Sequence, residues 1–386
     1  MTGRVLFYVQ HLLGIGHVVR AARIARALSE AGFAVKVAFG GPPVGSISWG
    51  GAELAHLPAL TSGPEGFGSL VDETGAVASA RFKEERRDEL LAMFTEVAPE
   101  IVLIEAYPFA RRIMRFELLP LIERAREVVP RPLIVSSIRD ILQEGRKHER
   151  LEETADIIET SFDAVLVHGD ERFAPLNASF PLTGRIASKL HYTGVIALER
   201  NLEKADERFD VIVSAGGGAV GGALLKTAAH AMTLTSLSDK RWLFLAGPNL
   251  DATSFDAVAA SLPENAKIER FRADLPALLA NAGLSISQAG YNTVADILCA
   301  RCASVLVPFS TGGETEQTVR AKLLAEKGVA AWVSEDDLTP DTLARAIAQA
   351  TRIDFSNASR LPDVKGAFQT AEILRKLLAG QKAEMR

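Results

Sequence analysis

Short apolar segments alternate along the chain with longer segments in which apolar residues recur every three or four positions. The first apolar run, Arg4–Val9, predicts a buried strand, and residues 17–31 predict a helix because their apolar side chains share one face. Gly32 ends this helix. Further strands are expected at residues 34–39, 100–105, 133–136 and 164–168. This alternation indicates a parallel, doubly wound α/β sheet.

The same rhythm restarts after a weaker, charged stretch at residues 187–210. Strands are expected at residues 210–214, 241–246, 267–271, 284–287, 304–308 and 329–333, and helices at 275–281, 291–300, 316–327 and 367–378. The pattern therefore predicts two α/β domains in tandem, facing a central cleft. Ligands of such sheets bind beyond the carboxyl ends of the strands, so the loops that follow the strands are the candidate sites.

Length and charge agree with this division. At about 150 residues per domain, 386 residues suggest two or three domains. The formal charge of −5 argues against a nucleic-acid-binding protein, which is usually basic. Apolar runs are shorter than the roughly 18 residues that span a bilayer, and residues 1–10 lack the features of a signal peptide. We therefore expect a cytoplasmic protein.

The two cysteines, Cys299 and Cys302, form a single C-x-x-C. A structural zinc site needs a second ligand pair, and these residues end a predicted helix instead of starting one, where a thiolate would be stabilised. No Asp-x-Asp pair follows a predicted strand. We therefore expect no metal and no cofactor.

The first candidate loop, residues 10–17, follows the first strand. Gly14 and Gly16 allow a sharp turn, and His17 starts the next helix. A histidine here can act as a general base or contact a ligand because it titrates near neutral pH. The alternative is a histidine whose hydrogen bonds are satisfied locally.

The second loop, residues 214–222, is rich in glycine and opens a helix, an arrangement that binds phosphate oxygens. It matches G-x-G-x-x-G, but the next strand ends in Gly247-Pro248 and not in the acidic residue that a dinucleotide site requires. No Gly-Lys-Ser/Thr follows it, so it is not a P-loop. We expect phosphate binding and no dinucleotide.

Two further loops carry polar residues at the starts of helices. The amides near Gly290 and the hydroxyl of Thr293 suit a diphosphate, and Asp296 suits the two hydroxyls of a ribose; the alternative for Asp296 is a favourable helix-dipole charge. Glu316 and Gln317 suit vicinal hydroxyls of a sugar, or else serve only the N-terminus of their helix.

Together these loops resemble the GT-B glycosyltransferases of family 28. The likeness is strongest over residues 211–350, where the glycine-rich loop, Phe-x-x-Asp-Leu, Ala-Gly-x-x-Thr-Val-x-Asp and Pro-Phe-x6-Glu-Gln occur in the order typical of the family. The best-known member transfers N-acetylglucosamine from UDP to a lipid-linked acceptor in peptidoglycan synthesis. The first domain matches only in its glycine–histidine turn and its β/α order.

The resemblance implies a donor site and roles within it. Its residues are Gly216, Gly217, Gly218, Phe271, Arg272, Gln288, Gly290, Asn292, Thr293, Asp296, Glu316 and Gln317. Phe271 and the Arg272 backbone would face the uracil, the amides around Gly290 the diphosphate, Asp296 the ribose, and the Glu316–Gln317 pair the donor sugar. Two residues depart from the family pattern: Asp296 replaces a longer Glu, and Glu316 replaces a Gln.

The first domain has a second resemblance. Gly14-x-Gly16-His17-x-x-Arg20 is similar to the opening of the UDP-sugar hydrolases of nonulosonic-acid synthesis, which have the same architecture. In those enzymes this histidine activates water. Hydrolysis is therefore the main rival chemistry to sugar transfer.

We expect a metal-independent, inverting transfer of a sugar from a nucleotide-linked donor, UDP in the first instance, to an acceptor hydroxyl. His17 is the first candidate base and Glu105 the second, while Gly14, Gly16 and Arg111 face the acceptor. Arg111 would bind an anionic acceptor or, alternatively, be a solvated helix charge. The glycine-rich residues 62–75 are expected to form a mobile acceptor loop.

The expected domains are residues 1–196 for the acceptor and 197–364 for the donor, with a C-terminal helix, 365–386, that returns to the first domain. The expected partners are the donor and an acceptor of unknown chemistry (glycan, lipid-linked or small molecule), with a peripheral membrane contact at the inner face if the acceptor is lipid-linked. A UDP-sugar hydrolase, a UDP-sugar epimerase and a non-catalytic nucleotide-sugar-binding protein remain as alternatives.

Overall fold

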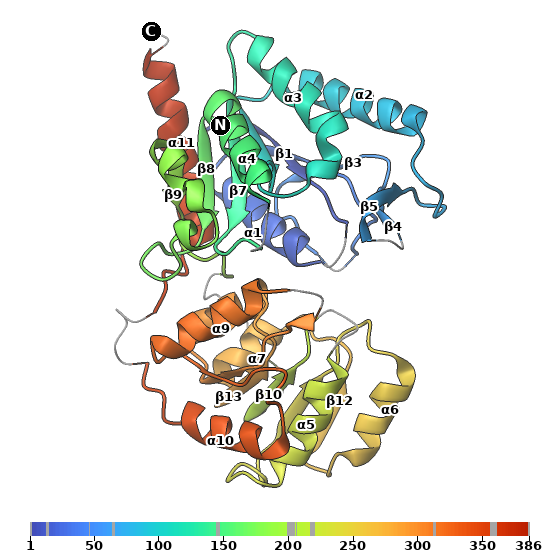
Figure 1. The fold of residues 1–386 in the computed structure, drawn as a ribbon, viewed down its shortest axis with the longest axis vertical. Coiled ribbons are helices and arrows are strands. Elements are labelled where there is room, and N and C mark those ends of the chain that lie inside the picture. Colours follow the sequence, from blue (N-terminus) through green and yellow to red (C-terminus); the bar gives the residue numbers. More distant parts are fainter. Residues whose placement is uncertain are drawn as a thin grey trace. The chain divides into compact units, whose positions relative to one another are not determined.

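In a computed structural model, the chain forms two compact α/β units (Figure 1). The structure describes residues 2–12, 15–45, 47–63, 66–143, 147–198, 205, 207–216, 221–311, 314–355 and 361–384. Unit 1 comprises Met1–Glu171, Pro175–Ile196 and Lys365–Arg386, and unit 2 comprises Arg172–Ala174 and Ala197–Val364.

Unit 1 is built on a seven-stranded parallel sheet of order β3-β2-β1-β6-β7-β8-β9. The strands are β1 (Arg4–Val9), β2 (Ala34–Phe39), β3 (Glu53–His56), β6 (Ile101–Glu105), β7 (Leu133–Arg139), β8 (Ala164–His168) and β9 (Leu190–Tyr192). The chain winds outward from β1 in one direction and outward from β6 in the other. The order therefore reverses between these two adjacent strands, which is where such sheets bind ligands.

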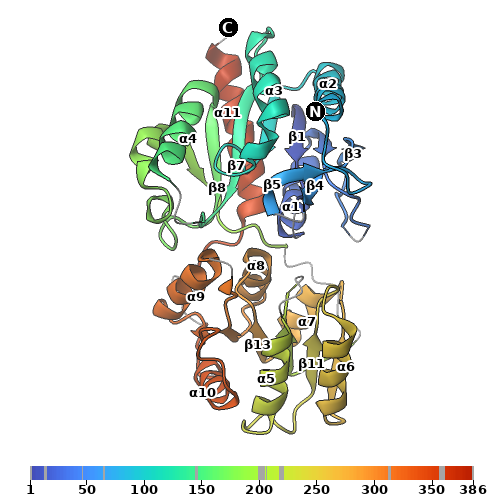
Figure 2. The ribbon, with the colours of Figure 1, turned by 45° about the vertical axis from the view of Figure 1, so that its right-hand side comes forward.

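Helices cover both faces of this sheet. Their bounds are α1 (Gly16–Glu30), α2 (Ala80–Val97), α3 (Arg115–Glu127), α4 (His148–Ser161) and α11 (Gly366–Glu384). Side chains of α2, α3 and α4 pack with Leu6, Val102 and Ile134 in one apolar core. On α11, Arg375 donates to the Ala31 carbonyl at 3.0 Å, so the last helix packs beside α1 although more than 300 residues separate them (Figure 2).

Unit 2 repeats the plan with a six-stranded parallel sheet of order β12-β11-β10-β13-β14-β15. Its strands are β10 (Val211–Ser214), β11 (Trp242–Leu245), β12 (Ala266–Glu269), β13 (Leu284–Ser287), β14 (Ser304–Leu306) and β15 (Ala331–Trp332). Helices α5 (Gly222–Met232), α6 (Ala252–Ser261) and α10 (Pro340–Ala350) pack on one face, and α7 (Leu275–Asn281), α8 (Tyr291–Ala300) and α9 (Glu316–Glu326) on the other. The strand order reverses between β10 and β13.

The predicted fold class is therefore confirmed, whereas several predicted strand bounds differ from the structure by two or three residues, as at β7, β14 and β15. Two local differences bear on the candidate sites. Residues 62–75 are not simply a loop, because β4 (Thr61–Gly63) and β5 (Gly66–Val71) pair as an antiparallel ribbon. The strand predicted at residues 267–271 ends at Glu269, so Phe271 lies in the loop beyond it. Short 3-10 helices, η1 (Arg112–Met114), η2 (Leu176–Ala178) and η3 (Pro181–Lys189), connect elements of unit 1.

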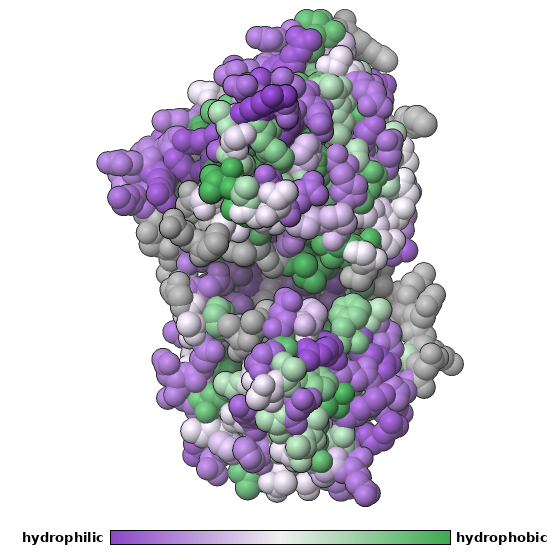
Figure 3. Space-filling view, turned by 90° about the vertical axis from the view of Figure 1, so that its right-hand side faces the viewer, coloured by the Kyte–Doolittle hydropathy of each residue, from purple (hydrophilic) through white to green (hydrophobic). Residues whose placement is uncertain are grey.

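Several large apolar side chains are exposed on the surface. Hydrophilic and hydrophobic residues are interspersed on the face of each unit drawn in Figure 3. The large apolar side chains with the greatest exposure include Val129, Val77, Phe271 and Phe368. Among the described helices, none has both the length and the apolar character to cross a membrane.

Candidate functional site

In unit 1, the point where the strand order reverses carries a histidine and a glutamate. Strands β1 and β6 run parallel, with Tyr8 paired to Ile104, so the loop after β1 and the last residue of β6 lie at the same edge of the sheet. His17 is the second residue of α1, which follows that loop, and Glu105 ends β6. The fold therefore brings together two residues that are 88 positions apart.

Glu105 is held by two donors. Its Oε1 lies 2.9 Å from His17 Nδ1 and also accepts a hydrogen bond from Arg20, one turn along α1. The Glu105 side chain is fully buried, whereas His17 keeps 22% of its side chain exposed. Burial alone would raise the pKa of Glu105, but the nearby His17, Arg20 and Arg111 hold it well below its usual value. Glu105 is therefore a carboxylate at neutral pH.

The same surroundings keep His17 neutral. Burial is the main cause that lowers its pKa, and Arg111 and Arg20 lower it further against the opposing effect of Glu105, so that the pKa falls to about 4. Nδ1 has two contacts: Glu105 at 2.9 Å, which can only accept, and Arg20 Nη2 at 3.2 Å, which can only donate. The shorter contact assigns the proton to Nδ1. The unprotonated Nε2 is then left to accept a proton, which is the state required of a general base.

Of the residues predicted to face the acceptor, the structure places two near this pair. Gly16 is the first residue of α1. Arg111 precedes η1 and interacts electrostatically with Glu105 and Arg20. Gly14 lies outside the described residues. The sequence motif includes Arg20 but assigns it no role, although its spacing of three from His17 places both on one face of a helix.

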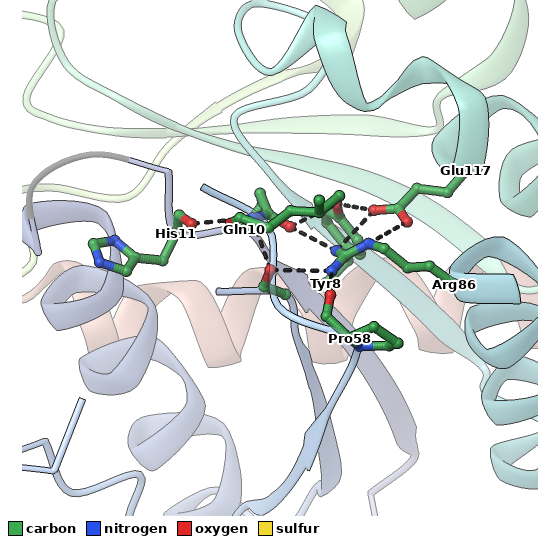
Figure 4. Close-up of polar contacts among 8 residues, drawn as sticks. Tyr8, Gln10, His11, Pro58, Arg86 and Glu117 are labelled. Atoms are coloured by element: carbon green, nitrogen blue, oxygen red, sulfur yellow. Dashed lines mark hydrogen bonds and ion pairs between the residues drawn. The ribbon is translucent and has the colours of Figure 1, made fainter. Parts of the chain in front are cut away.

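A second buried network lies behind this edge of the sheet, and Figure 4 shows how its side chains converge. Arg86 donates to Glu117 Oε2 at 2.7 Å and to Gln10 Oε1 at 2.6 Å. Gln10, the residue after β1, donates in turn to the Gly40 and Leu60 carbonyls. Tyr8 also donates to Glu117. The network fixes the residue from which the chain leaves β1 toward His17.

In unit 2, two predicted donor-site residues meet where the strand order reverses. Gly216 follows β10 with a φ of 72°, and Gln288 follows the adjacent strand, β13. A Cβ atom at position 216 would lie only 2.8 Å from Gln288 Oε1. The positive φ is what favours glycine here, because the Gln288 amide is the end of a flexible side chain and can move aside. Gly217 and Gly218 lie outside the described residues.

The start of α8 carries four more of the predicted residues. Gly290 is the N-cap of the helix, with the half-buried Asn292 and Thr293 in the first turn. Backbone amides at such a helix start attract phosphate oxygens. Asp296 lies further along, is only 8% exposed, and borders a small hollow lined by Leu198, Pro276, Cys299 and Ala300.

The loop after β12 presents an aromatic ring. The Phe271 side chain is 56% exposed, an unusual degree for a phenylalanine. Its neighbour Arg272 is clamped by Asp274, at 2.7 and 2.8 Å, and by Glu207 at 2.6 Å. These bonds raise the pKa of Arg272 and fix the backbone that carries Phe271.

The loop after β14 is held from two sides. Gln317 Oε1 accepts from the Phe309 amide at 3.2 Å, and Glu335 accepts from the Ser310 amide at 3.0 Å. Glu316 begins α9 and is only 4% exposed. The hydrogen bond from the Phe309 amide to Gln317 Oε1 therefore helps to hold the conformation of this loop.

Arg320 on α9 is a residue that sequence reasoning missed. It is buried, donates to the Ala289 carbonyl at 2.9 Å and lies over the Tyr291 ring. It thus links α9 to the loop that starts α8. The only signal in the sequence was its spacing of four from the predicted sugar-contacting Glu316, which places both on one face of the helix.

Cys302 is buried, and burial raises its pKa to about 12, so this thiol is not a thiolate at neutral pH.

Comparisons with known proteins match the sequence of the C-terminal half of the chain to a glycosyltransferase family. Residues 211–368 match the family model of the glycosyltransferase family 28 C-terminal domain. A similar protein is the UDP-N-acetylglucosamine--N-acetylmuramyl-(pentapeptide) pyrophosphoryl-undecaprenol N-acetylglucosamine transferase of Exiguobacterium sp. (strain ATCC BAA-1283 / AT1b), which is 31% identical over 58% of this chain and 62% of its own length. The chain thus spans about three fifths of the curated relatives that it matches first.

Solved structures extend the likeness in fold to nearly the whole chain. The calicheamicin glycosyltransferase CalG4 aligns with a TM-score of 0.64 at 15% identity over 99% of this chain and 98% of its own. Acinetobacter baumannii MurG aligns with a TM-score of 0.57 at 15% identity over 98% of this chain and 99% of its own. At this level of identity the likeness concerns the fold alone.

Proposed function

We propose that this chain transfers a sugar from a UDP-linked donor to an acceptor hydroxyl. The premise is that it is a family 28-like protein with the GT-B fold of two Rossmann-like domains. The observation that carries the proposal is the His17–Glu105 pair at the point where the strand order of unit 1 reverses. The family 28 match over residues 211–368 supports donor binding by unit 2.

The base in this proposal is His17. Its Nε2 takes the proton of the acceptor hydroxyl while the hydroxyl oxygen attacks the anomeric carbon of the donor sugar. The bond between that carbon and the UDP oxygen breaks in the same displacement, so the anomeric configuration inverts. Glu105 is a positioning residue: its low pKa makes it a weak base, but its carboxylate fixes Nδ1–H and stabilises the imidazolium that forms.

The leaving UDP is stabilised in this proposal by the backbone and not by a metal or cofactor. The helix start at Gly290 and the turn at Gly216 offer amides to the diphosphate. The exposed ring of Phe271 supports its assignment to the uracil. Asp296 takes the ribose hydroxyls, and Glu316 with Gln317 the sugar hydroxyls, where the shorter Asp296 and the acidic Glu316 would alter the choice of donor sugar.

The partners follow from the named relatives. Their donor is a UDP-N-acetylglucosamine and their acceptor a sugar joined to pyrophosphoryl-undecaprenol. We propose the same classes of partner here, a UDP-sugar and a lipid-linked hydroxyl, met by a cytoplasmic protein at the inner face of the membrane.

The test is incubation of the purified protein with a panel of UDP-sugars, first alone and then with a pyrophosphoryl-undecaprenol-linked sugar, while UDP and free sugar are measured. The proposal predicts UDP release that depends on the acceptor, with little free sugar. Rapid release of both UDP and free sugar without acceptor, abolished by His17→Ala, would instead identify a hydrolase.

Two other results bear on the alternatives. A shift in melting temperature with UDP but no turnover with any UDP-sugar would indicate a binding protein, and isomerised UDP-sugar would indicate an epimerase. If no UDP-sugar raises the melting temperature, the assignment of the donor fails.

A further inference from the structure

Arg111 carries a buried charge whose Nε and Nη2 atoms have no partner among the residues that the structure describes. Its Nε and Nη2 atoms are buried and find no hydrogen bond among the described residues, which also offer it no ion pair. Arg112 and Arg115 each have one such nitrogen as well, but both also form an ion pair with Glu153. The side chain of Arg111 is therefore free on one edge.

The edge formed by Nε and Nη2 of Arg111 presents two parallel N–H donors. The Nε–H and Nη2–H bonds of a guanidinium point the same way, side by side, and match the two oxygens of a carboxylate or a phosphate. An amine or a neutral sugar hydroxyl fits this fork less well, because only an oxyanion offers two acceptors and a compensating charge. The edge is thus suited to an anionic group.

The electrostatics of the surroundings agree with this. Arg111 interacts with Glu105, whose Oε1 accepts from Arg20 and His17, while its Oε2 is buried and has no hydrogen bond among the described residues. Two guanidinium groups therefore share one carboxylate. Burial lowers the pKa of Arg111, with Arg139 and Arg20 contributing, which shows that its charge is held at a cost. A buried, unpaired charge destabilises a fold unless a ligand compensates it.

The backbone supports the same conclusion. Arg111 has a φ of 60°, and Ala106, which follows Glu105 directly, has a φ of 64°. Such conformations are rare for residues other than glycine and each cost on the order of 1 kcal/mol. Two of them within six residues of Glu105 fix the segment that carries Arg111 beside the His17–Glu105 pair.

We infer that Arg111 binds an anionic group, a carboxylate or a phosphate, of the acceptor and thereby selects charged acceptors. The inference rests on the proposed function, because it takes His17 as the base that contacts the acceptor hydroxyl. Arg111 lies in the same unit as that base and beside its partner Glu105, whereas the family 28 donor domain is unit 2. The anion is therefore assigned to the acceptor and not to UDP.

The test compares ligands that differ only in charge. The full chain, saturated with UDP at constant ionic strength, is titrated calorimetrically with 4-nitrophenyl β-D-glucuronide, with the neutral 4-nitrophenyl β-D-glucoside and with methyl phosphate. The variants are Arg111→Gln, which removes the charge, Arg111→Lys, which keeps the charge but not the fork, and Arg124→Gln, a half-exposed arginine on α3, as control.

The anionic glycoside is expected to bind the wild type and Arg124→Gln at least about tenfold more tightly than the neutral one. Arg111→Gln should abolish this preference and Arg111→Lys should weaken it. Arg111→Gln should also keep or raise the melting temperature, because it removes an unpaired buried charge. A purely structural arginine would lower it.

Three results would overturn the inference: equal binding of the two glycosides by the wild type, a preference that survives Arg111→Gln, or binding of methyl phosphate at Arg111 without discrimination between the glycosides. The last would indicate a site for a free anion. UDP affinity, measured by titrating UDP into separate, UDP-free samples of the same variants, reports on the proposed function separately, because its absence would refute the donor assignment and leave the anion preference measurable.

Discussion

Replacement of Glu105 by glutamine tests two roles of this carboxylate: it orients the His17 ring, and it stabilises the fold by pairing with Arg20. Glu105 is fully buried, lies 2.9 Å from His17 Nδ1 and is paired with Arg20, whose side chain is only 3% exposed. Glu105→Gln keeps the shape but removes the negative charge. Both the buried guanidinium and the imidazole then lose the carboxylate that holds them.

Two magnitudes follow. Breaking a buried ion pair from one side costs about 3–5 kcal/mol, and the amide oxygen still accepts one bond, so we expect the free energy of unfolding to fall by about 3 kcal/mol at pH 7. An amide can also donate to Nδ1 and so place the proton on Nε2. Loss of the correct tautomer removes general-base catalysis, and kcat should fall by about 100-fold or more while KM for the donor changes little.

Glu117→Gln is the matched control, because Glu117 is equally buried and is paired with Arg86 and Tyr8. It should lower the free energy of unfolding by a similar amount but leave the titration of His17 unchanged. Glu105→Gln should lower the pKa of His17 further, because Glu105 is what raises it. Urea unfolding, NMR titration of the histidine ring and UDP release measure the three effects. Equal loss of turnover in both variants, or an unshifted His17, would refute the orienting role.

Three further predictions concern pH and the donor site. Folding lowers the pKa of His17 from 6.5 to about 4, so between these pH values the unfolded chain binds more protons than the folded chain. As the pH is lowered through this window, the free energy of unfolding, compared with that of His17→Ala, should therefore drop by up to about 3 kcal/mol. For the same reason kcat/KM should be level above about pH 5 and fall below about pH 4; a plateau that ends near pH 6.5 would contradict the assigned pKa. Gly216→Ala should lower the melting temperature because its φ is 72°, and it should weaken UDP binding because its Cβ would displace the Gln288 amide. Gly380→Ala is the control, since a Cβ there would meet no neighbouring atom in α11; equal effects of the two variants would contradict the prediction.

Periodicity and loop chemistry predicted much of the architecture. The bounds of β1, β2, β8 and β13 agree with the predicted strands, because each is a short apolar run bounded by residues that break it. Periodicity did not predict the β4–β5 ribbon, since Gly63, Gly66 and Gly68 resemble a loop and only the antiparallel pairing makes strands of them. Such pairing depends on contacts that no local pattern encodes.

For the candidate site, the loops after the strands predicted His17 and Glu105 as separate candidate bases. Their contact depends on the adjacency of β1 and β6, which the order of elements along the chain does not specify. Arg20 and Arg320 could not be assigned for a related reason: an arginine in an amphipathic helix is usually solvated, and only the packed structure shows that both are buried and bonded.

The central claim is that His17 drives transfer of sugar to an acceptor, and the partition of a labelled sugar tests it most directly. With radiolabelled UDP-N-acetylglucosamine and a pyrophosphoryl-undecaprenol-linked acceptor, the wild type and His148→Ala, which alters an exposed histidine on α4, should both place the label in the lipid product. His17→Ala should reduce that product by about 100-fold or more. Label that leaves the donor only as free sugar, or lipid product that His17→Ala reduces by less than about threefold, would contradict the account.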